Sequence, residues 1–375
     1  MSVTFLLGNG FDRALGLKTN YAAFYKWYCA RPTAGLTPWV KEFRGEIQKY
    51  ISKDPNADAY WSDAEYGLGQ YTEKFTLETS DRFGNCFDDF RDNLIVYLKG
   101  QQALLSDEMA DSMAAIFTRQ ISEFIQEIDP IERPAVIDSR NRLPAEDITL
   151  NFVCFNYTNA INQVFSALAQ KSLGQWRGTD GRLHKLILGK LIRAHGTLEQ
   201  WPIIGVCNPQ SIKNQELLKS PLFKATMLKS ESISISGELW RKNASEIIKS
   251  SRIICVFGMS LGETDSDYWE IIANWLTGDS YRHLIVFWHD VKAGNVNLSI
   301  PAKFTEVNRV KKKLLDFSSW SDEQYEKVSK RIHVVLKSPK MFVLPDENKV
   351  QQPEKGLAMS TEELIASVEQ ETPVT

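Results

Sequence analysis

The sequence has few cysteines, no long hydrophobic run and no excess of positive charge, and each absence excludes a class of protein. Its five cysteines include no Cys-x-x-Cys pair, so neither a cysteine-based zinc module nor a disulfide framework is expected. The longest apolar stretch, 253–261, is about half as long as a membrane-spanning helix requires. The first ten residues lack the basic segment of a secretory signal. We therefore expect a cytoplasmic protein.

The charge balance bears on the partners of the protein. The 375 residues include 44 Lys and Arg against 47 Asp and Glu, so the formal net charge is −3. Because nucleic-acid binding relies largely on neutralising phosphates, nucleic acid is not expected as a partner. Hydrophobic residues make up 43% of the chain and aromatic residues 11%, which is enough for a large core and excludes a mostly disordered chain.

Short β-rich runs alternate with helical segments along most of the chain. The clearest buried strand is predicted at 252–260. Residues from about 20 to 145 instead place apolar side chains three to four apart, which indicates a helical insertion. This alternation favours an α/β fold, a Rossmann-like, doubly wound parallel sheet over 1–343, with a polar, flexible tail at 344–375. Further strands are predicted at 3–7, 148–156, 186–195, 202–206, 283–288 and 332–336, and helices at 236–249, 268–276 and 321–331.

A glycine turn follows the first predicted strand. Gly8 and Gly10 flank Asn9, and Phe11 and Asp12 follow at the predicted start of a helix. Glycines in such a turn let the backbone approach a phosphate, which the amide groups of the next helix can bind. However, the third glycine of the dinucleotide fingerprint is missing, and no acidic residue stands about 20 residues beyond the strand to bind a ribose. Two interpretations stay open, a nucleotide-binding loop and an ordinary strand-to-helix turn.

Three more polar segments stand at the ends of predicted strands. Because parallel strands end at one edge of a sheet, these segments and the glycine turn are expected to converge on a ligand site. An asparagine there can hydrogen-bond a ligand, and a histidine can act as a general base. The alternatives are that Asn156 or Thr158 caps the next helix and that His195 is a structural histidine. The segments are Asn156-Tyr157-Thr158-Asn159, His195-Gly196-Thr197, and Gly258-Met259-Ser260-Leu261-Gly262 with Asp265.

The spacing of Gly258, Ser260 and Gly262 is also that of the nucleophile elbow of serine hydrolases. Such an enzyme needs an acid and then a histidine after the serine, and Asp290 and His333 stand in that order. A serine hydrolase is therefore one of the alternatives.

Taken together, these segments resemble the AbiH family of bacterial phage abortive-infection proteins. The resemblance spans residues 6 to about 290 and is most specific in the opening segment and in the Gly-x-Ser-Leu-Gly-x-x-Asp segment. It implies a role in phage defence. The segments that carry it are Leu7-Gly8-Asn9-Gly10-Phe11-Asp12 with Gly16-Leu17-Lys18-Thr19, Trp61-Ser62-Asp63-Ala64-Glu65, Phe155-Asn156-Tyr157-Thr158-Asn159, His195-Gly196-Thr197-Leu198 and Gly258-Met259-Ser260-Leu261-Gly262-Glu263-Thr264-Asp265.

The same segments, in the same order, are also similar to sirtuin-like NAD-binding domains. For the glycine turn, this similarity implies that Gly8 and Gly10 approach the pyrophosphate of NAD, with Phe11 in the same binding loop. Asn9 and Asp12 belong to that loop too, but they replace the small residue and the Ser or Thr that are usual there. The departures put the phosphate contacts in doubt.

For the other segments, the similarity implies that Asn156 positions water or the nicotinamide ribose and that His195 is the base acting on a ribose hydroxyl. Thr158 departs from the pattern, because defence versions usually have Asp at its position. The remaining nucleotide-binding residues that the similarity implies are Tyr157, Gly258, Ser260 and Asp265.

The zinc module of sirtuin-like deacylases is absent here, which favours plain NAD cleavage over deacylation. The resemblance thus predicts an NAD hydrolase that releases nicotinamide and ADP-ribose. NAD or a related nucleotide is then a substrate or ligand, and no cofactor or metal is expected. A phage-derived trigger and a homo-oligomer are partners compatible with the defence context, whereas a membrane is not expected as one.

Two further alternatives stay open. The departures at Asn9, Asp12 and Thr158 favour a nucleotide-binding sensor without turnover. The acids Asp63 and Glu65 are compatible with a nuclease effector of abortive infection. In the sequence these acids belong to a Trp-x-Asp-x-Glu run that predicts Trp61 and Glu65 on one face of a helix, which more simply indicates a packed helix with solvated acids.

Overall fold

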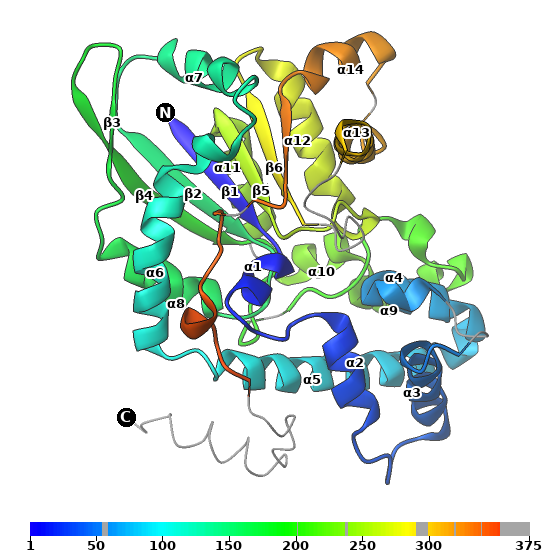
Figure 1. Cartoon of the computed structure of the whole chain (residues 1–375). Helices are drawn as coiled ribbons and strands as arrows, with labels where there is room; N and C mark the ends of the chain where they lie inside the picture. The colour runs from blue at the N-terminus through cyan, green and yellow to red at the C-terminus, as the bar shows by residue number, and fades with distance from the viewer. Residues whose placement is uncertain are drawn as a thin grey trace.

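One mixed sheet forms the centre of the computed structural model, which describes residues 1–54, 59–200, 202–236, 239–289, 299–318, 320–338 and 340–352. Within these residues, seven strands lie in the order β3-β4-β2-β1-β5-β6-β7 (Figure 1). Neighbouring strands are parallel except at the short edge strand β3. The strands are β1 (Ser2–Leu7), β2 (Ile148–Cys154), β3 (Gln175–Arg177), β4 (Leu183–Arg193), β5 (Ile253–Phe257), β6 (His283–Trp288) and β7 (Ile332–Leu336).

Most of the predicted strands are confirmed. β6 and β7 have the predicted bounds, and β2 and β5 end two or three residues earlier, because the loops that carry Asn156 and Ser260 begin directly after Cys154 and Phe257. The predicted strand at 202–206 is wrong. Its amides bond in different directions, from Ile203 to His195 O and from Val206 to Met227 O, so they form no ladder with a neighbouring strand.

Each face of the sheet packs against its own layer of helices, so the fold class is α/β, as predicted. β1, β5 and β6 are apolar almost throughout because both of their faces are covered. One layer contains α1 (Asn9–Ala14), α6 (Asp107–Ser122), α7 (Arg133–Asn141) and α8 (Ala160–Ala169). The opposite layer contains α11 (Trp240–Ser250), α12 (Ser266–Gly278), α13 (Ile300–Leu315) and α14 (Asp322–Ser329).

A third group of helices packs around a separate aromatic core instead of the sheet. Phe43 and Trp61 are fully buried there, with ring centroids 5.6 Å apart. The predicted insertion at 20–145 is thus helical, but its last two helices, α6 and α7, join the sheet layer. We call the third group the helical block; it contains α2 (Tyr21–Cys29), α3 (Pro38–Ile51), α4 (Ala64–Tyr71), α5 (Ser80–Gln102) and α9 (Pro221–Met227), which α10 (Lys229–Ser236) follows.

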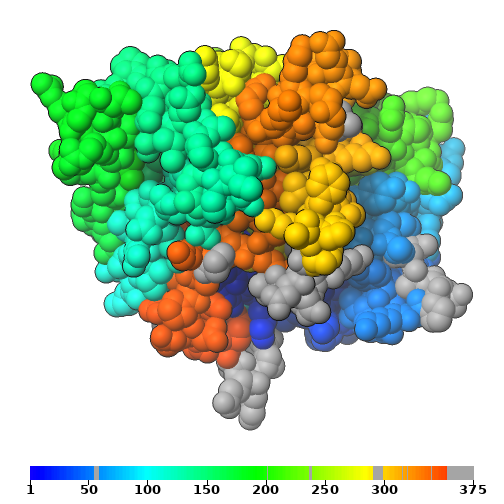
Figure 2. Space-filling view, turned by 45° about the horizontal axis from the view of Figure 1, so that its top comes forward, coloured from blue at the N-terminus to red at the C-terminus, as the bar shows by residue number. Residues whose placement is uncertain are grey.

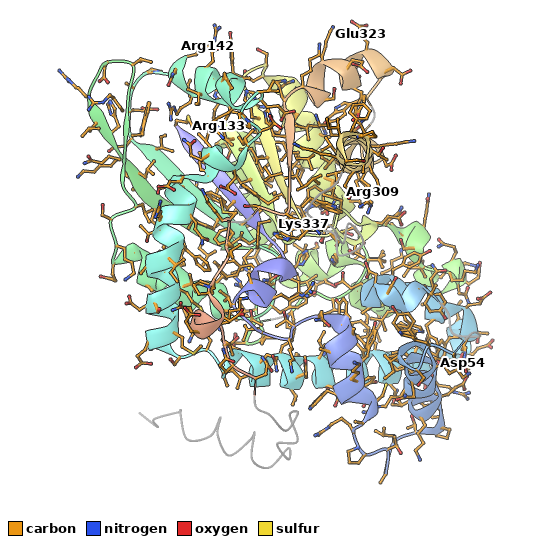
Figure 3. The ribbon with its side chains drawn as sticks, viewed as in Figure 1. Asp54, Arg133, Arg142, Arg309, Glu323 and Lys337 are labelled. Atoms are coloured by element: carbon orange, nitrogen blue, oxygen red, sulfur yellow. The ribbon has the colours of Figure 1, made fainter. Side chains whose placement is uncertain are left out.

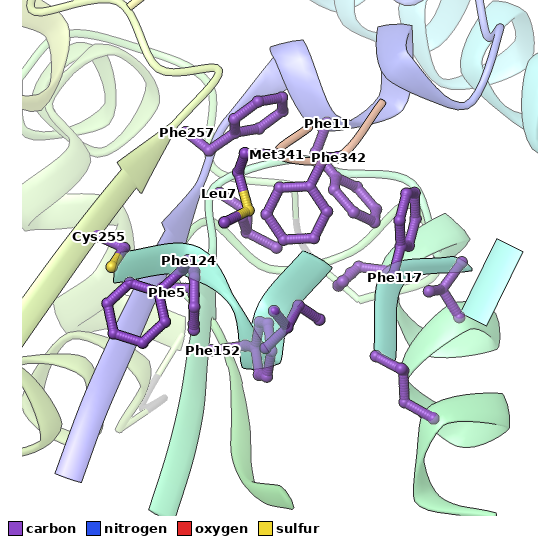
Figure 4. Packing of buried hydrophobic residues seen from close by; sticks show 14 of the residues in the cluster. Phe5, Leu7, Phe11, Phe117, Phe124, Phe152, Cys255, Phe257, Met341 and Phe342 are labelled. Atoms are coloured by element: carbon purple, nitrogen blue, oxygen red, sulfur yellow. The ribbon is translucent and has the colours of Figure 1, made fainter. Parts of the chain in front are cut away.

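The described end of the chain belongs to the core. Phe342 packs edge-on against Phe11, with centroids 5.3 Å apart, within the aromatic cluster of Figure 4. Val350 is buried, and its amide donates to Leu15 O at 2.7 Å. Figure 2 shows this red-orange segment lying against the cyan helix α6. Residues 344–352, which the sequence places in a flexible tail, therefore pack over α1, and the rest of that predicted tail lies outside the described residues.

Charged side chains such as Asp54, Arg142 and Glu323 lie at the periphery of the molecule in Figure 3. No helix in the described part of the chain is long and apolar enough to cross a membrane. Burying a charge is costly unless it is paired, so buried charged residues are the first candidates for a functional site. In the described part of the chain, the most deeply buried acidic, Arg and Lys side chains are Asp12, Arg44, Glu65, Arg193 and Lys229.

A buried histidine pair near the amino ends of β6 and β7 makes the stability depend on pH. His283 Nδ1 lies 2.9 Å from His333 Nε2, and His333 Nδ1 lies 2.7 Å from Glu132 Oε2. Burial, with the nearby charges of His333 and Arg331, lowers the pKa of His283 from 6.5 to about 3. Between these pH values the unfolded chain binds a proton that the folded chain does not. The free energy of unfolding therefore falls as the pH drops, by up to about 1.4 kcal/mol per pH unit.

We expect urea unfolding to reveal this loss when wild type is compared at pH 7 and about pH 5. A His283→Gln variant should lose less stability over the same range, because its amide keeps a donor and an acceptor but does not titrate. An equal pH dependence in the two proteins would contradict the assignment to His283.

Candidate functional site

The four polar segments that follow β1, β2, β4 and β5 meet at the carboxyl edge of the sheet. These strands are neighbours in the order β4-β2-β1-β5, so their ends lie side by side. Side-chain or backbone atoms of each segment contact another of the four segments. The edge is covered by the helical block, which contributes Glu65 from α4.

The glycines of the first segment pack against the loop after β5. The Gly10 amide donates to Gly258 O at 2.8 Å, and a Cβ on Gly10 would lie 2.3 Å from Gly258 Cα. Gly258 itself has φ +67°. The amides of Gly8 and Phe11 also donate within the protein, to Phe257 O and Gly8 O. Glycine is therefore required here because two backbones touch, and these three amides are already used.

A Gly258→Ala variant is expected to lose at least about 2 kcal/mol of stability. A positive φ costs an L-residue about 1–2 kcal/mol, and the added Cβ would also overlap Gly10. The matched control is Gly35→Ala, since Gly35 has φ +80° but nothing within 4 Å of its Cβ position. Urea unfolding should show a clearly larger loss for Gly258→Ala. Equal losses would mean that the contact between the two loops is unimportant.

The other residues of the glycine turn bond to their surroundings. Asn9 Nδ2 donates to Thr19 O at 3.1 Å, and the Thr19 hydroxyl donates to Asn9 Oδ1. Phe11 is fully buried in the sheet core. Asp12 is buried as well, and it points its carboxylate at the segment after β2.

Asp12 binds Asn156 and Thr158. Asn156 Nδ2 donates to Asp12 Oδ1 and Thr158 Oγ1 to Asp12 Oδ2, each at 2.7 Å. Burial raises the pKa of Asp12 to about 6, although both hydrogen bonds and Arg193 oppose that rise. The capping alternative for Asn156 and Thr158 is wrong, because the side chains bond to Asp12 and the N-cap of α8 is Asn159.

Arg193, the last residue of β4, supports the same segment from its other side. Its Nη2 donates to the carbonyl oxygens of Asn156 and Thr158 at 2.5 and 2.7 Å. Asn156 Oδ1 has no protein partner in the part of the chain described, so it is free to accept a hydrogen bond from a ligand. Asn156 is therefore fixed in position with an unused acceptor.

His195 forms a buried pair with Asp265, which ends the short turn η7 (Glu263–Asp265). His195 Nε2 lies 3.0 Å from Asp265 Oδ1, and the histidine is 5% exposed. Because a carboxylate only accepts, Nε2 carries a proton, and in the neutral imidazole Nδ1 is then the acceptor. Among the described residues Nδ1 has no hydrogen-bond partner. Burial raises the pKa of Asp265, but Lys229 and His195 outweigh burial and hold it well below its usual range.

Lys229 joins that pair to the helical block. Its Nζ lies 2.9 Å from Glu65 Oε2 and 3.1 Å from Asp265 Oδ1, and it is fully buried. Glu65 also accepts from the Tyr157 hydroxyl at 3.1 Å. We call Glu65, Lys229, Asp265 and His195 the Lys229 cluster. Sequence reasoning missed the lysine, since a single lysine outside any motif gives no signal before the fold brings it to the site.

The Trp-x-Asp-x-Glu run differs from its prediction. Trp61 lies in a short turn, η1 (Ala59–Ser62), so it does not share a helix face with Glu65. Asp63 caps α4 by accepting from the amides of Glu65 and Tyr66. Because Asp63 is a cap and Glu65 pairs with Lys229, the two acids do not form the free carboxylate pair that the nuclease alternative uses. Within the described residues, no group of three or more His, Cys, Asp and Glu residues is arranged to hold a metal ion.

The serine-hydrolase triad also differs from its prediction. Ser260 is exposed on the loop after β5. His333 bonds to His283 and Glu132 near the opposite, amino end of the sheet, so it is not the partner of Ser260. Asp290 lies outside the described residues. The histidine near this loop is His195, and it pairs with Asp265.

A comparison with protein families matches the model for bacteriophage abortive infection AbiH to residues 4–287 of the chain. The match includes all four strand-end segments and the whole helical block. A search of curated proteins finds no match.

Proposed function

Because the chain belongs to the AbiH family of bacteriophage abortive-infection proteins, we propose that it defends its host by hydrolysing NAD at the carboxyl edge of the sheet. The family points to abortive-infection defence, and the chemistry is our proposal. The observation that carries it is the buried His195–Asp265 pair, which lies beside the strand-end segment that holds Asn156. A base and a fixed polar side chain are what hydrolysis of a nucleotide ribose requires.

The order of the strands supports a nucleotide as the ligand. Numbered along the chain, the six parallel strands lie in the order 3-2-1-4-5-6. That order is shared by dinucleotide-binding sheets, in which the ligand lies across the carboxyl ends where the order reverses. We therefore interpret the sheet as Rossmann-like, with NAD across the ends of β1, β2, β4 and β5.

Two departures from the sirtuin-like pattern compensate each other. Asp12 stands where that pattern has Ser or Thr, and Thr158 stands where it has Asp. These two side chains hydrogen-bond to each other at 2.7 Å. The carboxylate and the hydroxyl have thus changed places while the pair is kept, which supports a retained site over a degenerate one.

In the proposed reaction a water molecule attacks C1′ of the nicotinamide ribose. The bond from C1′ to the nicotinamide nitrogen breaks, and its electron pair leaves with neutral nicotinamide. Nδ1 of His195 takes the proton of the water, and Asp265 stabilises the imidazolium that forms. Asn156 accepts a hydrogen bond from the water or a ribose hydroxyl through its free Oδ1. The products are nicotinamide and ADP-ribose, and NAD is a substrate here, so no cofactor is proposed.

The role that we propose for the glycine turn differs from the pyrophosphate binding that the sirtuin resemblance implies. Since the amides of Gly8, Gly10 and Phe11 donate within the protein, we propose that the turn fixes the position of Asp12 and of the loop after β5. Ser260, which is exposed on that loop, remains a proposed contact for the adenosine side, and Tyr157, which is half-buried, remains a proposed contact for the nucleotide.

The test is free nicotinamide after incubation of the full chain with NAD. The assay is run with pure protein and in extracts of phage-infected cells, because we propose that a phage-derived trigger or assembly into a homo-oligomer switches the enzyme on. Nicotinamide release in either setting supports the proposal. NAD that binds but stays intact in both would replace it with the sensor function, and the absence of both binding and release would refute a nucleotide site.

A further inference from the structure

We propose that Lys229 is a positioning residue that disfavours a proton on His195 by offsetting part of the negative charge of the two carboxylates beside it. The lysine occupies the first position of α10, and its ammonium group lies between Glu65 of the helical block and Asp265 of the sheet edge. The role of His195 as base rests on the proposed function, whereas the effect of Lys229 on His195 does not depend on it.

The contacts of Lys229 leave it little freedom. Besides the two carboxylates, its Nζ donates to Thr264 O at 2.8 Å, so three oxygen atoms from two parts of the fold surround it. Burial opposes the charged form, but Asp265 and Glu65 raise the pKa of Lys229 well above its usual value, so the ammonium stays charged. Asp265 Oδ1 accepts from both Lys229 and His195.

The charges of the Lys229 cluster do not cancel. Two carboxylates face one ammonium, which leaves an excess of one negative charge beside the imidazole of His195. Removing Lys229 would leave two uncompensated carboxylates, which favours a proton on Glu65, whose pKa burial already raises, and on His195 beside Asp265. Removing the charge of Glu65 would leave a balanced pair and would disfavour a proton on His195.

Other titratable groups near His195 do not change this balance. Burial raises the pKa values of Tyr157 and Tyr268, so both phenols are neutral at physiological pH. Burial also raises the pKa of the Cys207 thiol. The groups around His195 are Asp265 on η7, Lys229 on α10, Glu65 on α4, Tyr157 after β2 and Tyr268 on α12, with Cys207 and the cap residue Asp63 near the carboxylates.

The two variants therefore have opposite expected effects. Lys229→Met should raise the pKa of His195 by about one unit or more, and Glu65→Gln should lower it by a similar amount. If Lys229 only supported the fold, the two variants would shift the pKa of His195 in the same direction or not at all. Lys229→Arg should restore a value close to wild type, because it keeps the charge.

The measurement is an NMR titration of the full chain labelled with ¹⁵N-histidine, with the His195 signal assigned by its loss in His195→Gln. The matched control is Arg44→Met, which breaks another buried ion pair, Arg44 with Asp89 at 2.7 Å, inside the helical block. This variant should leave the His195 titration unchanged. Circular dichroism checks that each variant is folded, and if Lys229→Met does not fold, Glu65→Gln alone decides the direction.

Opposite shifts in the two variants, with none in the control, would support the proposal, and shifts of one sign or no shifts would overturn it. The acid limb of the pH–rate profile for nicotinamide release should move with the NMR value. If wild type releases no nicotinamide in any setting, the proposed reaction fails while the titration still decides the role of Lys229.

Discussion

Replacing His195 with alanine is expected to lower the rate of nicotinamide release from NAD by about 100-fold or more, with the chain still folded. General bases contribute at about this level. Among the described residues around the His195 imidazole, we identify no second side chain that could act as the base. Asp265 already accepts from Lys229 and His195, and its lowered pKa makes it a poor proton acceptor. The measurement is the initial rate of nicotinamide formation at saturating NAD.

His184, near the start of the strand that His195 follows, supplies the matched control. His184 lies near the other end of β4 and also bonds to an aspartate, with its Nε2 3.1 Å from Asp180 Oδ1, but this pair is on the hairpin far from the proposed site. His184→Ala should therefore release nicotinamide at the wild-type rate. If His195→Ala keeps the wild-type rate as well, His195 is a structural histidine and the base must be sought elsewhere.

Asp265→Asn tests the other half of this pair. The amide keeps the size of the side chain, but it no longer carries the charge that stabilises the imidazolium. Its NH2 group also competes with the Lys229 ammonium for hydrogen-bond acceptors. We expect a loss of release that is smaller than that of His195→Ala, because the base itself is still present.

The placement of the polar segments could be predicted from the sequence, because it follows from one rule about parallel sheets. The apolar runs that form β1, β2 and β5 lead within a few residues to Asn9, Asn156 and Ser260, and strands in parallel necessarily end together. The bounds of β6 were predictable for the same reason, since a strand buried on both faces gives a continuous apolar run.

The contacts inside the site could not be predicted. Lys229 reaches Glu65 and Asp265 only after a helix of the block has been folded onto the sheet edge, and no local pattern encodes that approach. The exchange of roles between Asp12 and Thr158 was visible in the sequence only as two unrelated departures, because their pairing depends on strands distant in the chain.

One helix was missed although its pattern lies in the sequence. α13 places Ile300 and Phe304 in solvent, 86% and 69% exposed, and buries Val310 and Leu314. These apolar residues nevertheless recur on one face of the helix, so the amphipathic pattern was present in the sequence and could have predicted α13. The prediction at 202–206 is the opposite case, a strand that does not form. The composition there is β-like, but the segment is a loop whose hydrogen bonds depend on distant residues.

Removing Asp12 is expected to reduce both stability and nicotinamide release, although Asp12 is not proposed to touch the reacting atoms. Asp12→Ala leaves the buried Asn156 amide and the Thr158 hydroxyl without their acceptor, which should cost about 1–3 kcal/mol in the free energy of unfolding. Since Asn156 then loses its fixed orientation, we expect release to fall by at least about 10-fold. Urea unfolding and the initial rate measure the two effects separately.

A double-mutant cycle distinguishes this indirect role from a direct one. If Asp12 acts through Asn156, then Asn156→Ala should lower release by itself, and adding Asp12→Ala to it should cause little further loss. The Thr158→Val variant removes the other hydrogen bond to Asp12 but leaves Asn156 in place, so it should affect stability more than release. Independent, multiplicative losses in the double variant would mean that Asp12 contacts the substrate itself.

The pH dependence offers a further check on Asp12. Only the ionised carboxylate accepts from both Asn156 and Thr158 at once, because a protonated acid gives up one acceptor position. Burial raises the pKa of Asp12 to about 6, so this arrangement is present above pH 6 and is lost as the pH falls below it. Asn156 should therefore be less well oriented at pH 5 than at pH 7, and the ratio of wild-type to Asn156→Ala rates should shrink towards acid pH. A constant ratio from pH 7 to 5 would mean that the orientation of Asn156 does not depend on the charge of Asp12.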